Sequence, residues 1–252
     1  MEVILFKRRV YLFIVQFSVL LGCASLTLVS AAEAGASPLR FAVYGDPPWV
    51  IQEDGEDRGI VPYYSKKFIQ NSELSIVMLP MPYKRSIHSI MSEDVDFVVA
   101  LAGSELREQA EPFIRIGRLA IVLFSARPIP DLSLSDVNVV TVAGAEKEAQ
   151  AWLPNWNHAV VNSESIALRA AAKGRFDVAM LTRNAYEYYA DQDVELQAGF
   201  VKDIGLAEVF VWVKKGSKHL ARYQEAKTQI EKVSFDGKLV LDWYTVNLPE
   251  LE

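Results

Sequence analysis

Arg107 is the residue of this sequence whose type and position most clearly indicate binding chemistry. It ends the segment 104–107, which follows the apolar run 97–101. A guanidinium presents a planar fork of donors that matches the two oxygens of a carboxylate, above all where water is excluded. Ligands of open α/β sheets lie at the carboxyl ends of the strands, so this segment is predicted to face a cleft. The alternative is a solvated arginine at a helix start, paired with Glu105 or Glu108.

Two aromatic residues follow the first predicted strand, residues 39–43, at the same end. Tyr44 comes directly after that strand, and Trp49 follows Pro47-Pro48. At this position aromatic faces can form the wall of a ligand site. An aromatic side chain beside two prolines can equally serve packing between elements, and for Trp49 both interpretations stay open.

The sequence lacks the residue patterns expected for a metal site, for two common enzyme motifs and for nucleic-acid binding. The three histidines, at positions 88, 158 and 219, have no paired spacing, and Cys23 is the single cysteine, so we expect no metal site. The sequence has no Gly-x-Ser-x-Gly elbow and no phosphate-binding glycine-rich loop. With 26 basic against 32 acidic side chains and a net charge of −6, nucleic acid is an unsuitable partner. We therefore expect a protein that is not an enzyme and has no cofactor.

The elements that must position these residues alternate between strand and helix. The predicted strands are residues 39–43, 75–79, 97–101, 116–124, 137–142, 159–161, 178–181 and 206–213. The predicted helices are residues 62–70, a helix through Ile87 and Met91 to about Asp94, residues 146–153 and 164–173, and a last helix capped by Ser217. The fold class is therefore α/β with mainly parallel sheets.

The first 34 residues are predicted to be a secretory signal peptide. A basic start is followed by a long apolar stretch and by small residues up to Ala34. Lipid attachment at Cys23, within a lipobox-like Leu-Leu-Gly-Cys, and an uncleaved membrane span over 10–29 are the alternatives. All three place the remaining chain outside the cytoplasm, so we expect a periplasmic protein.

Two long apolar runs divide the rest of the chain. Residues 116–124 and 206–213 bracket a middle section that carries strands and helices of its own. We expect lobe 1 to comprise residues 35–125 plus 207–252, and an inserted lobe 2 to comprise residues 126–206. The cleft between the lobes is the predicted ligand site.

The chain resembles the type 2 periplasmic solute-binding proteins, specifically extracellular solute-binding protein family 3, which includes the polar amino acid receptors of ABC importers. The residues that carry the resemblance are Leu39 to Val43 leading to Pro47-Pro48-Trp49, Gly59, Pro82, Asp96 before Phe97, Ser104 to Arg107, Asp136 to Val140 and Lys173 to Val178. The resemblance implies a monomeric two-lobed clamshell that closes over a small solute and presents it to a membrane permease. It also implies that Arg107 holds the ligand carboxylate, with a hydroxyl from Ser104, and that Ala102 and an aromatic at Tyr44 line the site. Asp96 and Asp177 are structural in this family.

The second lobe departs from the family's amino acid pattern. Thr182, followed by Arg183, stands where an acid that holds an α-amino group is expected, and Ala145 replaces a hydroxyl residue after Gly144. Glu146 could supply an acid, or it could simply favour the start of its helix. Arg183 could add a second anion contact or be a surface charge. The ligand is thus a carboxylate without an amine, or an amine that is bound differently.

These observations predict a solute-binding protein that captures an amino acid or related organic acid for an ABC-type importer. Two alternatives have the same fold. One is a periplasmic enzyme similar to cyclohexadienyl dehydratase, in which Glu146 or another acid in the cleft would protonate a leaving hydroxyl. The other is a ligand-sensing partner of a membrane receptor.

Overall fold

The computed structural model describes residues 37–53, 55–62, 75–103 and 105–217, together with 221, 224, 225, 227, 228, 241 and 242. The chain divides into two units, Met1–Ser37 and Pro38–Glu252, and the second holds nearly all of the described residues. The predicted signal peptide, most of the predicted helix 62–70 and most of the helix after Ser217 lie outside the described residues. Within them, no helix has both the length and the apolar character to cross a membrane.

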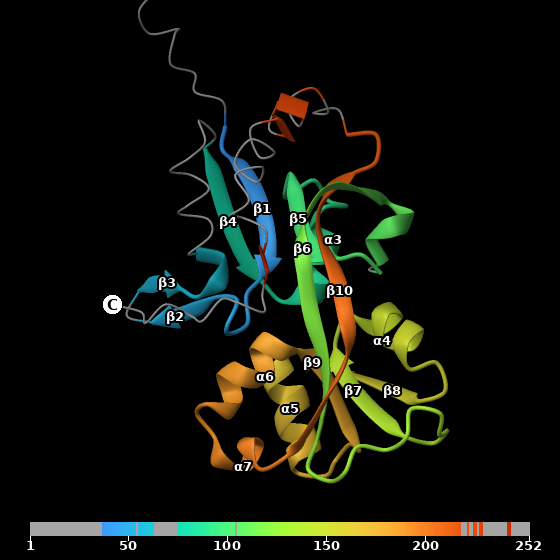
Figure 1. Ribbon diagram of the computed structural model, residues 1–252. Coiled ribbons are helices and arrows are strands. Elements are labelled where there is room, and N and C mark those ends of the chain that lie inside the picture. Colours follow the sequence, from blue (N-terminus) through green and yellow to red (C-terminus); the bar gives the residue numbers. More distant parts are fainter. Residues whose placement is uncertain are drawn as a thin grey trace, which may run out of the picture. The chain divides into compact units, whose positions relative to one another are not determined.

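One mixed sheet runs through the second unit (Figure 1). The strands are β1 (Leu39–Tyr44), β4 (Ile76–Met81), β5 (Phe97–Leu101), β6 (Ala110–Ser125), β7 (Asn138–Val142), β8 (Asn157–Val161), β9 (Val178–Thr182), β10 (Phe200–Lys214) and β11 (Leu241–Asp242). Their order is β4-β1-β5-β10-β6-β9-β7-β8, and β11 pairs with β6. A separate hairpin joins β2 (Ile51–Glu53) to β3 (Glu56–Arg58).

Two groups of parallel strands are joined by one antiparallel pair. We call β4, β1 and β5 with α3 (Tyr83–Ser89) and the 3-10 turn η1 (Glu105–Glu108) lobe 1. Lobe 2 contains β8, β7 and β9 with α4 (Glu146–Trp152), α5 (Glu164–Ala172), α6 (Arg183–Ala190) and α7 (Val194–Gln197). The long strands β6 and β10 pair along their whole length and belong to both lobes.

The α/β two-lobed fold is confirmed, with both long apolar runs forming the connecting strands. The exact division of the chain into lobes stays a prediction: Ser125 ends β6, whereas residue 206 lies inside β10. Both strands begin before the predicted runs, β6 at Ala110 and β10 at Phe200. The early part of β10 is mostly exposed and contains Asp203, so it lacks the apolar pattern by which strands are recognised.

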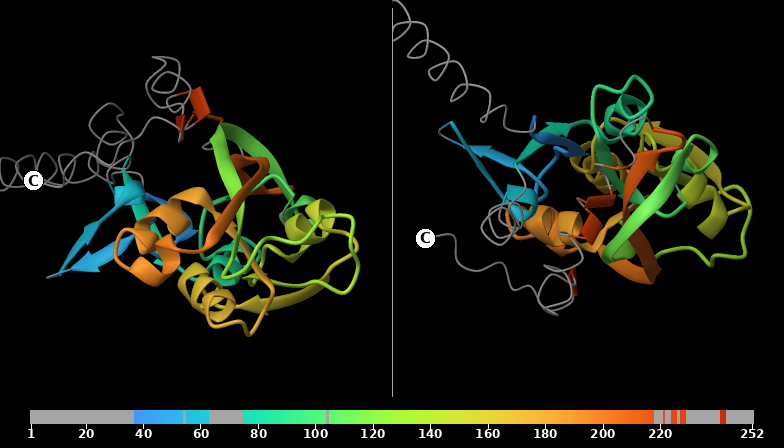
Figure 2. Two further views of the ribbon diagram at one scale, coloured as in Figure 1. Left: turned by 60° about the horizontal axis from the view of Figure 1, so that its bottom comes forward. Right: turned by 90° about the horizontal axis from the view of Figure 1, so that it is seen from above.

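Alternating side chains place cores on both faces of the lobe 2 sheet. Val122 and Phe124 pack with α5, α6 and α7, whereas Ile121 and Leu123 pack with α4. This alternation is the two-residue period of a strand. Figure 2 shows α4 on one side of the lobe 2 strands and α5 to α7 on the other. Buried Trp156 belongs to the α4 cluster.

Lobe 1 has the same arrangement around β1 and β5. Phe41 stacks on Phe97 at 4.7 Å between ring centroids in one cluster, while Ala42 and Val98 contact α3 on the opposite face. The helix α3 ends at Ser89, earlier than the predicted Asp94. Three serine hydroxyls, on Ser86, Ser89 and Ser92, donate to the carbonyl three residues earlier, a competition that weakens regular helix.

Both ends of α5 have ordinary capping residues. Ser163 caps its start, where its Oγ accepts from the Ile166 N–H, and Gly174 takes φ +68° just after the C-cap Lys173. Asp96 and Asp177 are structural, as the family resemblance implied. Their carboxylates accept backbone N–H groups at the starts of neighbouring strands, Arg40 N–H at 2.8 Å and Asn138 N–H at 2.8 Å.

Candidate functional site

The C-terminal end of β1 brings a carboxylate of lobe 1 to the N-terminus of α5 in lobe 2. The Tyr44 hydroxyl donates to Asp46 Oδ2 at 3.0 Å. The Glu164 N–H donates to the same Asp46 oxygen at 3.1 Å and lies 3.3 Å from the Tyr44 hydroxyl. Free N–H groups and the helix dipole both favour an anion at this end of a helix. Burial raises the pKa of Asp46, while these hydrogen bonds oppose that effect.

Glu164 brings an acid to the place in lobe 2 where the family pattern expects one, beside Thr182. Its side chain is 3% exposed, and its Oε1 accepts from the Thr182 N–H at 2.7 Å and the Thr182 hydroxyl at 2.9 Å. Its Oε2 accepts from Trp49 Nε1 of lobe 1 at 3.3 Å. Burial raises the pKa of Glu164 to about 7 even though these donors lower it. A carboxylate therefore does lie beside Thr182, contributed by a residue 18 positions earlier.

Trp49 combines the two roles left open by the sequence. Its ring packs against Ile60, Leu119 and Val209, so it belongs to the core beside the connecting strands. Its indole N–H reaches Glu164 across the contact between the lobes. Tyr44 also does both, because its ring lies edge-on to Tyr83 at 5.8 Å while its hydroxyl contacts lobe 2.

Arg107 lies in the segment of lobe 1 that faces α4. Its Nε donates to the carbonyl of Ala102, and the side chain is exposed. Its two terminal nitrogens have no hydrogen-bond or ion-pair partner among the described residues. The next residue, Glu108, pairs with Lys147 of α4 at 2.8 Å, which brings this segment against lobe 2. Ser104 lies outside the described residues.

Glu148 faces the same segment from α4. It is 5% exposed, and a Cβ added to Gly103 would lie 3.0 Å from its Cγ. Neither carboxylate oxygen of Glu148 has a hydrogen-bond partner within the described part of the chain. Burial raises the pKa of this carboxyl to about 7, with its own backbone N–H lowering it and the charges of Glu146 and Glu105 raising it further.

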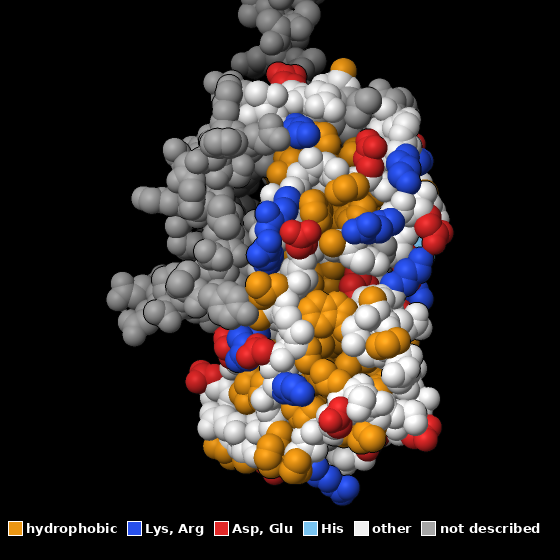
Figure 3. Space-filling model, turned by 45° about the vertical axis from the view of Figure 1, so that its right-hand side comes forward, with side chains coloured by type: hydrophobic (Ala, Val, Ile, Leu, Met, Phe, Trp, Pro, Cys, Tyr) orange, Lys and Arg blue, Asp and Glu red, His pale blue; other side chains and the backbone are white. Residues whose placement is uncertain are grey.

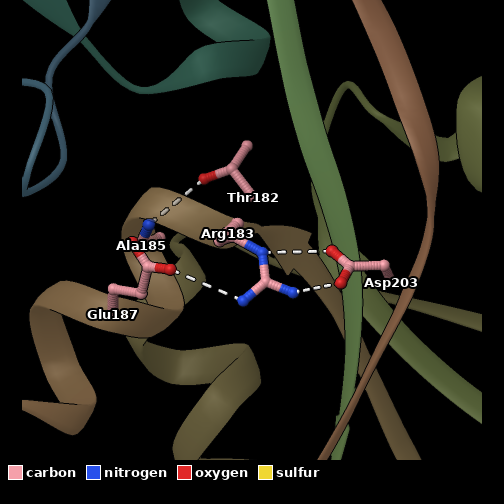
Figure 4. Close-up of polar contacts among 5 residues, drawn as sticks. All are labelled: Thr182, Arg183, Ala185, Glu187 and Asp203. Carbon is pink, nitrogen blue, oxygen red and sulfur yellow. Dashed lines mark hydrogen bonds and ion pairs between the residues drawn. The ribbon is translucent and has the colours of Figure 1, made fainter. Parts of the chain in front are cut away.

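The structure directs Glu146 and Arg183 to partners within lobe 2. Glu146 Oε2 accepts from the Gly144 N–H at 2.5 Å, at the start of α4. Arg183 makes two contacts with Asp203, from Nε at 3.0 Å and from Nη2 at 2.5 Å, and lies 3.5 Å from Glu187 (Figure 4). In this conformation both side chains satisfy structural contacts, and their predicted ligand contacts stay predictions.

Sequence reasoning missed Asp46, Glu148 and Glu164. Each is an acid in an unremarkable setting, either after a strand or in the first turn of a helix. A usable signal existed for Glu164, because it follows a strong cap at Ser163, and a helix start is a common place for binding groups. No group of three or more His, Cys, Asp or Glu residues in the described ranges is arranged to hold a metal ion.

Partly buried apolar side chains of α4 and β10 pack against each other. Trp152 of α4 lies over Gly205 of β10, where an added Cβ would lie 2.5 Å from the ring, and Ile204 and Ala207 pack in the same cluster. Figure 3 shows apolar side chains across the middle of one face, with charged side chains of both signs around them. Trp152 thus packs within the α4 cluster.

Comparison with solved structures identifies the architecture. The substrate-binding protein of an amino acid ABC transporter matches with a TM-score of 0.64 and 19% identity, over 82% of this chain and 99% of that one. The chain has the two-lobed fold of periplasmic binding proteins. The same fold matches the arginine-, lysine-, histidine-binding protein ArtJ from Geobacillus stearothermophilus, with a TM-score of 0.63 and 12% identity, over 81% of this chain and 92% of that one.

A third structure with this fold is an ancestral amino-acid-binding protein that is a precursor of cyclohexadienyl dehydratase. It matches with a TM-score of 0.63 and 17% identity, over 80% of this chain and 92% of that one. No model of a protein family matches the sequence, and no curated protein matches it either. The resemblance to family 3 solute-binding proteins is therefore confirmed at the level of the fold.

Proposed function

We propose that this chain is an extracytoplasmic solute-binding protein that holds a small carboxylate-bearing solute between its lobes for an ABC-type importer. The observation that carries the proposal is the chemistry of the contact between the lobes. Acidic and aromatic side chains meet there. They are partly buried Asp46 and Tyr44 and buried Trp49 from lobe 1, and buried Glu148 and Glu164 from lobe 2. Mostly preformed sites with a few precisely placed polar groups are typical of small-molecule binding.

Arg107 is the proposed anchor for the ligand carboxylate. Its Nε is fixed on the Ala102 carbonyl, and its two terminal nitrogens have no partner among the described residues. A guanidinium held in this way keeps its remaining donors available for the two oxygens of a carboxylate. Ser104, Tyr44, Trp49, Ala102, Glu146 and Thr182 are the further proposed contacts.

A thermal-shift screen of amino acids, dicarboxylates, keto acids and aromatic acids tests this function. A ligand present at a hundred times its Kd stabilises the folded protein by about 2.7 kcal/mol. We expect Arg107→Ala and Arg107→Lys to abolish or sharply weaken the shift of the hit. Arg175→Ala, at an exposed position after α5, is the matched control and should keep the full shift. A hit that both Arg107 variants retain would show that the anchor is another residue.

A periplasmic enzyme is the second candidate, and one observation favours it. The pKa of about 7 for Glu148 leaves much of this carboxyl protonated at neutral pH, as a general acid requires. In that role Glu148 would protonate a leaving hydroxyl of a carboxylate held by Arg107. Incubation of each hit with the protein, followed by mass spectrometry, separates the two functions. A binding protein returns the ligand unchanged, and a dehydratase releases a product lighter by one water.

The partner and the location follow from the same proposal. An importer's permease would receive the closed form, and a membrane receptor would do so if the protein serves sensing instead. Fractionation of cells that produce the full chain tests the location outside the cytoplasm. Co-purification with the permease after chemical cross-linking, in the presence of the screened ligand, tests the partner.

A further inference from the structure

The first turn of α5 receives part of its cap from the opposite lobe. Within lobe 2, Ser163 Oγ accepts from the Ile166 N–H at 3.3 Å. From lobe 1, Asp46 Oδ2 accepts from the Glu164 N–H at 3.1 Å, and the Ser165 backbone also donates to this carboxylate. The first N–H groups of a helix have no partner inside the helix. Two of those in α5 therefore lose their protein partner when the lobes separate.

The side chain at the start of α5 makes a second connection between the lobes. Trp49 Nε1 of lobe 1 donates to Glu164 Oε2 at 3.3 Å, while Glu164 Oε1 accepts from Thr182 of lobe 2. This buried carboxylate thus has donors from both lobes, and separation removes one of them. Hydrogen bonds to an ionised acceptor are stronger than those between neutral groups, so this one favours contact between the lobes.

A further contact between the lobes is apolar. Val142 and Ala145 of lobe 2 are buried in one cluster with residues of α3, namely Tyr83 and Ile87. Gly144 lies directly on this helix, since an added Cβ would lie 3.0 Å from Tyr83 Cδ1 and 3.2 Å from Ile87 Cδ1. At this separation the lobes are in van der Waals contact, with no space for a solute at that point. Burial of apolar surface favours the contact without help from a ligand.

We propose that the lobes stay closed on each other without solute, held by the Asp46 cap of α5 and by the packing of Gly144 on α3. All of these contacts join groups of the protein itself, so they require no third molecule. The inference goes beyond the proposed function, because it concerns the resting state of the chain. A solute that enters only the open form then binds with an affinity reduced in proportion to the open fraction.

Single-molecule fluorescence energy transfer on the full chain, dialysed free of small molecules, tests the inference. Cys23→Ser removes the single native cysteine. His88→Cys on α3 and Arg169→Cys on α5 provide exposed labelling positions, one in each lobe. We expect mainly one state, with the transfer efficiency that corresponds to the distance between these two positions in the structure. A chain that occupies mainly a state of lower efficiency would overturn the inference and leave the proposed function intact.

Asp46→Ala removes the part of the α5 cap that lobe 1 supplies. In the labelled chain it should raise the ratio of open to closed molecules at least tenfold, which equals about 1.4 kcal/mol or more. Asp46→Asn, which keeps the shape of the side chain and removes its charge, should raise the ratio by a smaller factor and serves if the alanine variant does not fold.

Asp191→Ala is the matched control, because it removes an exposed aspartate at the end of α6 within lobe 2. It should leave the ratio of open to closed molecules unchanged. A ratio that stays at the wild-type value in the folded Asp46 variants would overturn the inference, as would an equal rise in the Asp191 control. The proposed function is tested separately, because no solute is present in these measurements.

Discussion

The buried carboxyl of Glu148 should make the stability of the ligand-free protein depend on pH. Its ordinary pKa of 4.5 is raised to about 7 in the folded chain, mainly by burial. The folded state therefore holds this proton between pH 4.5 and about 7, where the unfolded chain has released it. The stabilisation is fully present below pH 4.5 and is lost as the pH rises through 7. At about 1.4 kcal/mol per pH unit, the loss is about 3 kcal/mol.

Glu148→Gln isolates this contribution because a neutral amide resembles the protonated acid. We expect the variant and wild type to have similar free energies of unfolding at pH 4.5. At pH 8 the variant should be the more stable by up to about 3 kcal/mol. Urea denaturation followed by tryptophan fluorescence at half-unit steps from pH 4.5 to 8.5 measures both profiles. Glu164, whose pKa is also raised to about 7, is present in both proteins and cancels in the difference.

Parallel pH profiles for the two proteins would refute this reasoning. They would mean that solvent or another group satisfies the Glu148 carboxylate in the folded state. Glu195→Gln gives the size of the effect expected from removing one exposed acid of the same kind, and its profile should follow that of wild type.

Two further predictions concern the contacts between and within the lobes. Trp49→Phe keeps an aromatic ring in the cluster, although a smaller one, and removes the N–H that reaches Glu164. We expect about 1–3 kcal/mol less stability at pH 8, measured by urea denaturation, and a smaller loss at pH 5, where Glu164 is protonated. An equal loss at both pH values would point to packing instead. Gly205 has φ +150°, and Gly205→Ala places a Cβ 2.5 Å from the Trp152 ring, so calorimetry should show a lower Tm. Gly216→Ala is the comparison, because Gly216 has φ +67° and open space around it, and this variant should lower the Tm less.

Much of the fold could be predicted from sequence because each buried strand here has a local signal. Residues 97–101 form a continuous apolar run, and the same residues make up β5. The hairpin of β2 and β3 was missed because five of its six residues are charged or polar and mostly exposed, so no apolar alternation marks it. Its pairing comes from the turn at Gly55.

The site was less predictable because its groups meet only through tertiary structure. The contact of Glu164 with Thr182 depends on the packing of α5 against β9, and that of Glu148 with Gly103 depends on the approach of two lobes. The family pattern predicts an acid at the position of Thr182. Glu164 was missed because it reaches the same place in space from a different position in the sequence. Arg183 illustrates the converse, because its residue type suggested an anion site while its neighbours in space are acids of its own lobe.

The pairing of β6 with β10 has a consequence for how lobe 2 is held in the chain. Ser125 lies opposite Phe200 at the end of this ladder, so the segment between them leaves and returns at adjacent points. Ends this close resemble the termini at which whole domains are inserted or exchanged in engineered chimaeras. Residues 126–199 could accordingly be excised and replaced by the corresponding segment of another protein of this fold, transferring one side of the proposed ligand site in one graft.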